Sequence, residues 1–422
     1  MDNPIPTRIA VIGAGVAGIT AAYLLQRSAN VKLFEKNARL GGHTNTITIE
    51  DGPDAGTPVD TGFIVMNDRT YPLLHTLLEQ WSCPVRYSDM SFSYFSEQTG
   101  FHYAGTTLSG LFVQRRNLFR PSYYKFLSEI YRFGKQAIRD LENNAVGSQS
   151  LGDYVRHLSP LTVNSYIIPM AAAIWSATQH DILGFPAKNL LTFWRNHGLL
   201  SLTDRPTWQT VVGGSHSYVK AFARSFCGQI ALRSDIASIR RLDDHVMIVH
   251  RNGEEEIFDK LVLATHADEA LALLENPTSD EQRLLGAWRY QENRTLLHTD
   301  ASVLPANRKA WASWNYYDRN DAKPDNPVPV TYHMNRLQGL KTLDDYFVTL
   351  NPDREPARGT LIRDIVYHHP VFSEAAVATQ PHLPSLQGRL HTWFCGSYFG
   401  YGFHEDAVRS AVQMAELHGV SL

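Results

Sequence analysis

The glycines near the N-terminus form the pattern with the clearest chemistry in the sequence. Gly13, Gly15 and Gly18 fit GxGxxG, directly after the apolar run 8–12 and directly before the helical pattern 19–26. The first glycine permits a tight turn, the second lets the backbone approach a pyrophosphate, and the third lets the helix pack on the strand. The helix N-terminus then faces the phosphates with its free N–H groups. We predict a dinucleotide site whose loop comprises Gly13, Ala14, Gly15, Val16, Ala17 and Gly18.

A carboxylate follows at the position where a ribose would lie. The run 31–35 has the composition of a second strand and ends in Glu35, 17 residues beyond Gly18. Glu35 can accept hydrogen bonds from both hydroxyls of a ribose, and its charge would repel a 2'-phosphate. The sequence therefore favours a dinucleotide with an unphosphorylated adenosine ribose.

A second glycine pair lies soon after this acid. Lys36 begins a segment that contains Arg39, Gly41, Gly42 and His43, and a further polar turn follows at 59–63. Its backbone N–H groups and guanidinium could approach the same pyrophosphate. These residues alone leave open whether the dinucleotide is NAD or FAD.

With GxGxxG, the glutamate and the RxGG segment 39–42, the chain resembles the FAD-dependent amine oxidase, phytoene desaturase and protoporphyrinogen oxidase superfamily. The resemblance implies FAD, with Glu35 on the adenosine ribose and RxGG beside the pyrophosphate and flavin. We expect the FAD to be noncovalent, with Cys395 in a buried strand. Beyond the loop, the expected FAD contacts are Glu35, Lys36, Arg39, Gly41, Gly42, His43, Thr61, Gly62, Phe63, Ile236, Ala237, Thr265, Gly396, Ser397, Gly402, Phe403, His404 and Glu405.

The C-terminal segment 390–408 resembles the closing motif of that superfamily, in which a helix N-terminus points at the flavin pyrimidine. Its N–H groups would stabilise the negative charge of a reduced flavin. Two departures weigh against amine oxidation: Ser397 replaces the usual acid, and Phe403 stands where amine oxidases carry a cage tyrosine. His404 and Tyr401 are the candidate proton-handling residues, because both lie in the loop expected beside the flavin; a structural role is the alternative for the histidine.

These motifs require elements that lie far apart in the chain. The expected fold class is α/β, with a Rossmann-type FAD-binding domain interleaved with an α+β substrate domain of mixed sheet and helices. We assign 1–85, 206–289 and 386–422 to the FAD-binding domain, and 86–205 and 290–385 to the substrate domain. Expected strands of the substrate domain are 295–299, 311–317, 328–334, 346–350 and 361–368, which 91–95 and 101–103 could join. The aromatic strand 311–317 could wall a cavity or fill the core.

Composition excludes several other classes of protein. The chain has 422 residues, a net charge of -3 and 43% hydrophobic residues, which argues against nucleic-acid binding and disorder. Three isolated cysteines offer neither a disulfide framework nor a CxxC pair, which favours a cytoplasmic location, and the histidines lack metal-ligand spacing. We expect no signal peptide and no membrane span. The single GxGxxG suggests that O2 or an external acceptor, not NAD(P)H, exchanges electrons with the flavin.

The segment 111–139 is unusually basic. It holds seven Lys or Arg residues against one acid, Glu129, interleaved with aromatic residues, and is expected to be helical. Such a helix could lie on the inner face of an anionic membrane, or it could be a core-facing helix with a solvated basic face.

Further runs, including DTGFIVMNDRTYP and WFCGSYFGYGFHEDAV, resemble a bacterial subgroup of the superfamily associated with cyclopropane-fatty-acid-synthase-like enzymes. That resemblance implies an apolar substrate such as a fatty or phospholipid acyl chain, from which hydride would be removed in a desaturation or oxidation. The alternatives are a flavin amine oxidase, a redox-neutral fatty-acid double-bond isomerase and a non-enzymatic FAD-binding scaffold.

Overall fold

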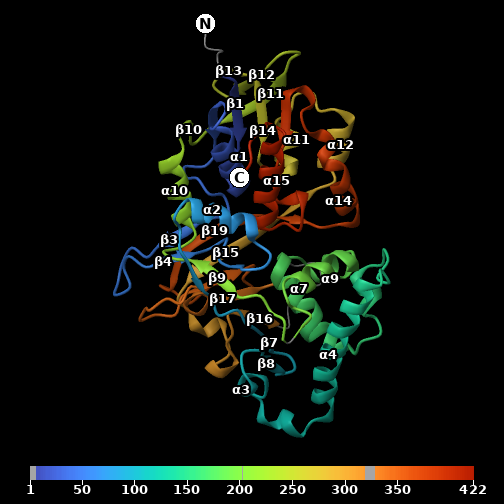
Figure 1. Cartoon of the computed structure of the whole chain (residues 1–422). Helices are drawn as coiled ribbons and strands as arrows, with labels where there is room; N and C mark the ends of the chain where they lie inside the picture. Colours follow the sequence, from blue (N-terminus) through green and yellow to red (C-terminus); the bar gives the residue numbers. More distant parts are fainter. Residues whose placement is uncertain (1–5, 202, 319–327) are drawn as a thin grey trace.

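The computed structural model describes residues 6–201, 203–318 and 328–422. The glycine-rich motif lies on a parallel five-stranded sheet of order β10-β2-β1-β14-β20. Helix α1 (Val16–Leu25) packs against α15 (His404–Glu416) beside this sheet, so the first and the last helix of the described chain are neighbours (Figure 1). The Rossmann-type, α/β prediction is confirmed. The strands are β10 (Gln229–Ala231), β2 (Asn30–Phe34), β1 (Arg8–Ile12), β14 (Lys260–Leu263) and β20 (Thr392–Phe394).

A second, seven-stranded sheet has the order β19-β15-β18-β17-β16-β7-β8. The sheet is mixed: β16 and β7 are parallel, and all the other neighbouring strands in the sheet are antiparallel. The early segments expected to join this sheet do so. The strands are β19 (Leu361–Val371), β15 (Arg289–His298), β18 (Phe347–Leu350), β17 (Val330–His333), β16 (Trp314–Asp318), β7 (Phe92–Ser96) and β8 (His102–Ala104).

Helices lie beside this sheet in the lower half of Figure 1. The longest is α4 (Pro121–Glu142), which packs against α9 (Ala187–Asn196), while α7 (Ile168–Trp175) contacts β16. Other helices of the described chain are α2 (Pro72–Gln80), α3 (Leu108–Leu111), α5 (Leu151–Val155), α6 (Pro160–Thr162), α8 (Gln179–Gly184), α10 (His216–Ser225), α11 (Ala267–Leu273), α12 (Ser279–Leu285), α13 (Met334–Leu337) and α14 (Glu374–Thr379).

Three small sheets complete the fold. The turn at Asn252-Gly253 joins β12 to β13 in an antiparallel pair, as the hairpin signal predicts. The strands of these sheets are β11 (Ile236–Arg241), β12 (Val246–His250) and β13 (Glu255–Phe258); β3 (Thr46–Thr48) and β4 (Pro58–Asp60); and β5 (Met66–Asn67), β9 (Trp208–Val211) and β6 (Val85–Tyr87).

The expected helix over 111–139 is wrong in its first part. Residues 115–119 form a 3-10 turn, and the long helix begins only at Pro121. Proline is tolerated in the first turn of a helix, where its missing N–H has no partner to lose, and it disfavours helical backbone in the residue before it. Arg120 is accordingly extended. Helix α4 buries Tyr123, Phe126 and Phe133 and leaves its basic residues exposed.

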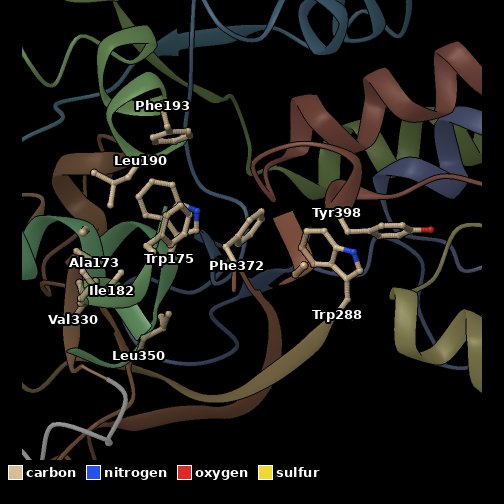
Figure 2. Close-up of a cluster of buried hydrophobic side chains, with 14 of the residues drawn as sticks. Ala173, Trp175, Ile182, Leu190, Phe193, Trp288, Val330, Leu350, Phe372 and Tyr398 are labelled. Carbon is tan, nitrogen blue, oxygen red and sulfur yellow. The ribbon is translucent and has the colours of Figure 1, made fainter. Parts of the chain in front are cut away.

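One hydrophobic core joins the two large sheets. Figure 2 shows Phe372 between Trp175 of the helical layer and Trp288 near the Rossmann-type sheet. The rings of Trp288 and Phe372 meet edge to face with centroids 5.3 Å apart, and Trp288 also lies 6.0 Å from Tyr398. This continuous packing fixes the position of the substrate-domain strands relative to the nucleotide motifs. Within the described residues, no helix has both the length and the apolar composition needed to cross a bilayer.

Candidate functional site

A single cavity of about 1650 Å³ runs from the glycine-rich loop into the space between the seven-stranded sheet and helices α7 and α9. Ligand pockets usually measure ~300–1,000 Å³. The cavity therefore has room for a dinucleotide and a second molecule. It is lined by all the predicted cofactor residues except Gly18 and Glu405, and also by Tyr401.

Two glycines of the first motif, Gly13 and Gly18, lie where a side chain would not fit, whereas the position of a Cβ atom on Gly15 is open. Gly13 has φ +97°, and a Cβ atom on it would lie 2.8 Å from the carbonyl oxygen of Ala264. A Cβ atom on Gly18 would lie 1.8 Å from the carbonyl oxygen of Gly13. Gly18 thus serves helix packing and does not line the cavity. Gly41 pairs with Gly15 in an isolated bridge, which brings the RxGG segment beside the first loop.

Glu35 is buried at the end of β2 and held from two directions. Its Oε2 accepts a hydrogen bond from the backbone N–H of Ala14 at 2.9 Å, and its Oε1 accepts from the backbone and side chain of Asn37 at 2.9 and 2.7 Å. A carboxylate has about four acceptor positions, so capacity remains for a ligand hydroxyl. The geometry fits the expected ribose contact.

Arg39 lines the cavity, but its guanidinium also holds the loop together. It donates to the carbonyl oxygens of Leu40, Gly42 and Thr44 at 3.3, 2.8 and 3.2 Å. These three bonds fix the glycine pair next to the first loop. The side chain therefore shapes the phosphate-facing backbone in addition to supplying positive charge.

The structure places Glu405 outside the cavity. Its carboxylate accepts from the backbone N–H groups of Leu73 and Leu74, at 3.1 and 3.0 Å, in the first turn of α2. Those N–H groups have no partner within their own helix, and a carboxylate there is favoured by the helix dipole. Glu405 anchors α2 to α15, a role that its place in the sequence does not reveal.

His404 is the first residue of α15, and its partly buried side chain lines the cavity. Its ring stacks on Phe63 with centroids 3.7 Å apart, and its Nε2 lies 3.1 Å from Oγ1 of Thr44. Burial lowers the pKa of His404 to about 3. The imidazole is therefore neutral near pH 7 and can take part in a hydrogen bond. Tyr401, the other candidate, lies on the cavity wall 5.7 Å from the ring of Phe193, and burial raises the pKa of its hydroxyl.

His369 on β19, which the sequence did not single out as a site residue, faces the cavity. The side-chain nitrogen of Asn293 donates to Nδ1 of His369 at 2.9 Å. The Asn293 amide cannot be reversed, because its oxygen accepts from Gln291 at 2.9 Å and from Asn351 at 2.8 Å. This network leaves the proton of neutral His369 on Nε2. Burial first, then His266 and His368, lowers the pKa of His369 to about 4.

His369 belongs to a cluster of rings between the RxGG segment and the C-terminal loop. Its ring lies 5.2 Å from that of His43, and the ring of His266 stacks on Tyr290 at 4.2 Å. On the other side, a Cβ atom on Gly402 would lie 3.6 Å from Pro370. Because side chains alternate along a strand, the sequence placed Tyr367 and His369 on the same face of β19. The neighbouring pair His368 and His369 does not by itself indicate a functional site.

The far half of the cavity is a mostly apolar chamber, with Arg205 as a charged lining residue near Tyr166. Trp314 of the aromatic strand lines it, whereas Tyr316 packs on Tyr94 in the core with centroids 5.6 Å apart, so the strand serves both expected purposes. We define the chamber by the cavity-lining residues Phe92, Tyr103, Tyr166, Met170, Ile174, Trp175, Phe193, Trp314, Tyr332, Leu350 and Phe372.

The described residues contain no cluster of His, Cys, Asp or Glu able to hold a metal ion. Cys395 is buried at the end of β20, and burial raises the pKa of its thiol to about 12. A thiol that resists ionisation is a poor nucleophile. This environment fits the expectation of noncovalent FAD.

Comparisons with known proteins bear on this site. The family described as NAD(P)-binding Rossmann-like domain matches residues 11–81. A mouse L-amino-acid oxidase is 23% identical over 97% of this chain and 70% of its own length.

Solved structures share the whole fold. The CLA-producing fatty acid isomerase from P. acnes superposes with a TM-score of 0.65 at 16% identity, covering 99% of both chains. Cyclohexylamine oxidase from Brevibacterium oxydans superposes with a TM-score of 0.63 at 15% identity, covering 98% of this chain and all of its own. The chain thus has a Rossmann-like nucleotide-binding segment within a fold that it shares with these enzymes.

Proposed function

We propose that this chain is an FAD-dependent oxidoreductase that removes hydride from an apolar substrate, most specifically a fatty or phospholipid acyl chain. The observation that carries the proposal is the cavity that joins the dinucleotide motifs to a mostly apolar chamber. A substrate in the chamber and a flavin beside the C-terminal loop would share one continuous cavity. Hydride transfer requires that proximity.

The residues that line the cavity near the glycine-rich loop fit FAD. Glu35 would hold the adenosine ribose, the backbone N–H groups at Gly15 and Gly42 would face the diphosphate, and the N-terminus of α15 would face the flavin pyrimidine. When bound, the flavin supplies the hydride acceptor. The protein would contribute orientation, exclusion of water and the fixed N–H dipoles of α15.

The chamber fits a long apolar chain. Trp175, Phe193 and Tyr332 present ring faces and edges, and Met170 and Leu350 add flexible apolar surface. Each methylene group taken out of water contributes ~0.8 kcal/mol. An acyl chain would thus be held along its length mainly by apolar contacts, with Arg205 as a charged group near Tyr166.

The same rings support amine oxidation as a second candidate. The ring of Phe403 stacks on Phe193 at 4.6 Å and lies 6.2 Å from Trp175, at the start of α15. Aromatic faces attract cationic amines, and the chain is related to an L-amino-acid oxidase. The third candidate, redox-neutral double-bond isomerisation, is supported by the mostly apolar chamber and by the shared fold of a fatty acid isomerase.

Anaerobic flavin absorbance separates these candidates. Purified protein is mixed with free fatty acids, phospholipids or amines, and the oxidised flavin band is followed. Bleaching by acyl substrates supports our proposal, whereas bleaching by amines alone contradicts it. Unchanged absorbance with a shifted double bond, detected by mass spectrometry, identifies the isomerase. Oxygen uptake after bleaching then tests whether O2 is the acceptor.

A blocked chamber provides the specificity control. Met170→Trp fills the chamber and should slow bleaching by long acyl chains at least tenfold without changing flavin content. Leu343→Trp adds the same bulk at a side chain that is 82% exposed and should change neither quantity. Equal bleaching rates in Met170→Trp and wild type would remove the chamber from the proposal.

A further inference from the structure

A projecting surface at the end of the molecule opposite the Rossmann-type sheet combines exposed apolar and basic side chains. In Figure 1, α3 and the beginning of α4 lie at this end. Phe119 is 87% exposed and Leu108 is 79% exposed, and Tyr124 is also exposed. Arg115, Arg116 and Arg120 stand between them in sequence and are exposed as well. We call these six residues the distal surface.

The charge of this surface has one sign. The sequence contains no Asp or Glu between Glu97 and Glu129. In the part of the chain that the structure describes, no acidic side chain lies within ion-pair distance of Arg115, Arg116 or Arg120. Unpaired arginines beside exposed large apolar side chains are uncommon on a surface that faces only water. The combination is complementary to a surface with anionic groups above an apolar layer.

The distal surface is held rigidly despite its exposure. The hydroxyl of Tyr123 donates to the carbonyl oxygen of Leu111, and that of Tyr124 donates to the carbonyl oxygen of Leu118 at 3.0 Å. Side-chain bonds from Gln114 to Gly100 at 2.7 Å tie the same segment to the β7–β8 turn. Phe119 is therefore presented outward by a braced turn, at little cost in conformational entropy on contact.

This surface also lies beside the chamber. Tyr103 and Gly105 line the cavity, and Gly105 is two residues before Thr107, whose side chain caps α3. A molecule at the distal surface is thus separated from the chamber by the short segment that joins β8 to α3.

We propose that the distal surface docks the protein on an anionic phospholipid bilayer, with the arginines at the headgroups and Phe119 and Leu108 in the boundary layer. Arginines near anionic lipids and aromatic side chains at the headgroup level are the features that hold peripheral proteins at bilayers. The delivery of acyl substrate from the bilayer to the chamber rests on the proposed function, whereas docking itself does not.

Co-sedimentation of the full chain with vesicles tests docking. The probes are vesicles of phosphatidylcholine alone and of phosphatidylcholine with 30% phosphatidylglycerol. We expect at least tenfold stronger partitioning to the anionic vesicles, weakened by high salt because the arginines act electrostatically. Negligible or equal binding to both vesicles would overturn the proposal and leave an acidic protein partner as the occupant to test.

Two charge-matched triple variants locate the contact. Arg115→Glu, Arg116→Glu and Arg120→Glu together should reduce partitioning at least tenfold. Lys220→Glu, Lys341→Glu and Arg358→Glu change the net charge equally at exposed positions elsewhere and should leave most of the binding. Equal losses in both variants would mean that net charge, not the distal surface, is responsible. Phe119→Ser should weaken the binding that remains at high salt.

The outcome is independent of the flavin chemistry. Vesicle binding is measured without turnover, and flavin bleaching is measured with detergent-dispersed fatty acid. Bleaching without vesicle binding would refute docking and retain the proposed function. Vesicle binding without bleaching would refute the proposed function and retain docking.

Discussion

His404 offers the most direct test of how the site handles protons. Its ring is enclosed between Phe63 and Thr44 at the positive end of a helix, and burial lowers its pKa from 6.5 to about 3. In the unfolded chain the same imidazole gains its proton near pH 6.5. The unfolded state therefore binds more protons as the pH falls below 6.5, and the stability that the neutral ring contributes is lost in that range.

The magnitude follows from the pKa difference. At pH 5.0 the unfolded imidazole is about 1.5 pH units below its pKa, while the folded one is still neutral, which amounts to ~2 kcal/mol at ~1.36 kcal/mol per unit. His404→Gln keeps a nitrogen donor toward Thr44 but cannot titrate. Between pH 7.5 and 5.0 we expect wild type to lose ~2 kcal/mol more stability than this variant.

Urea unfolding followed by tryptophan fluorescence at both pH values measures the difference. The other buried histidines, such as His197 and His298, contribute to both chains and cancel. His382→Gln, at an exposed position outside the cavity, should behave as wild type. Losses in wild type and His404→Gln that agree within ~0.5 kcal/mol would refute the buried neutral imidazole, and His404 would become a stronger candidate for proton transfer near neutral pH.

Three further predictions concern the same site. Gly18→Ala should abolish flavin binding, measured by flavin absorbance per protein, because its Cβ would lie 1.8 Å from the Gly13 carbonyl oxygen; Gly184→Ala, with open space around its Cβ, should bind normally. Acid precipitation should release all flavin into the supernatant, and Cys395→Ala should retain full flavin content; flavin that stays with the precipitate would indicate a covalent bond. Asn293→Asp replaces the hydrogen-bond donor at Nδ1 of His369 with an acceptor. We therefore expect ¹⁵N NMR to show the His369 proton on Nδ1 and a pKa of His369 above about 4. An unchanged spectrum would contradict the described network.

Local patterns in the sequence were sufficient where function depends on consecutive residues. The glycine-rich loop and Glu35 could be predicted because a strand, a turn and a helix in fixed order leave few alternatives. The strands of the second sheet were also recognisable, although β15 begins at Arg289, six residues before the predicted 295, since its partner β19 continues to Val371. Pairing with a distant strand sets that boundary, not local propensity.

The remainder depended on contacts between distant segments. The tautomer of His369 is set by Asn293, 76 residues earlier, and Glu405 caps a helix that begins more than 330 residues before it. Single-sequence patterns do not report such pairs. His404 was expected in the loop beside the flavin, but it is the first residue of α15. Its contacts with Phe63 and Thr44 join distant segments and could not be predicted from the residues around it.

The position of β20 and α15 has a consequence for how the protein matures. β20 forms one edge of the parallel sheet, and α15 packs on α1 beside the glycine-rich loop. During synthesis the ribosome releases the glycine-rich loop early, but the segment that covers it emerges only after residues 392–416 have been made. A dinucleotide in the cavity would therefore gain its full set of protein contacts only after residues 392–416 have been made.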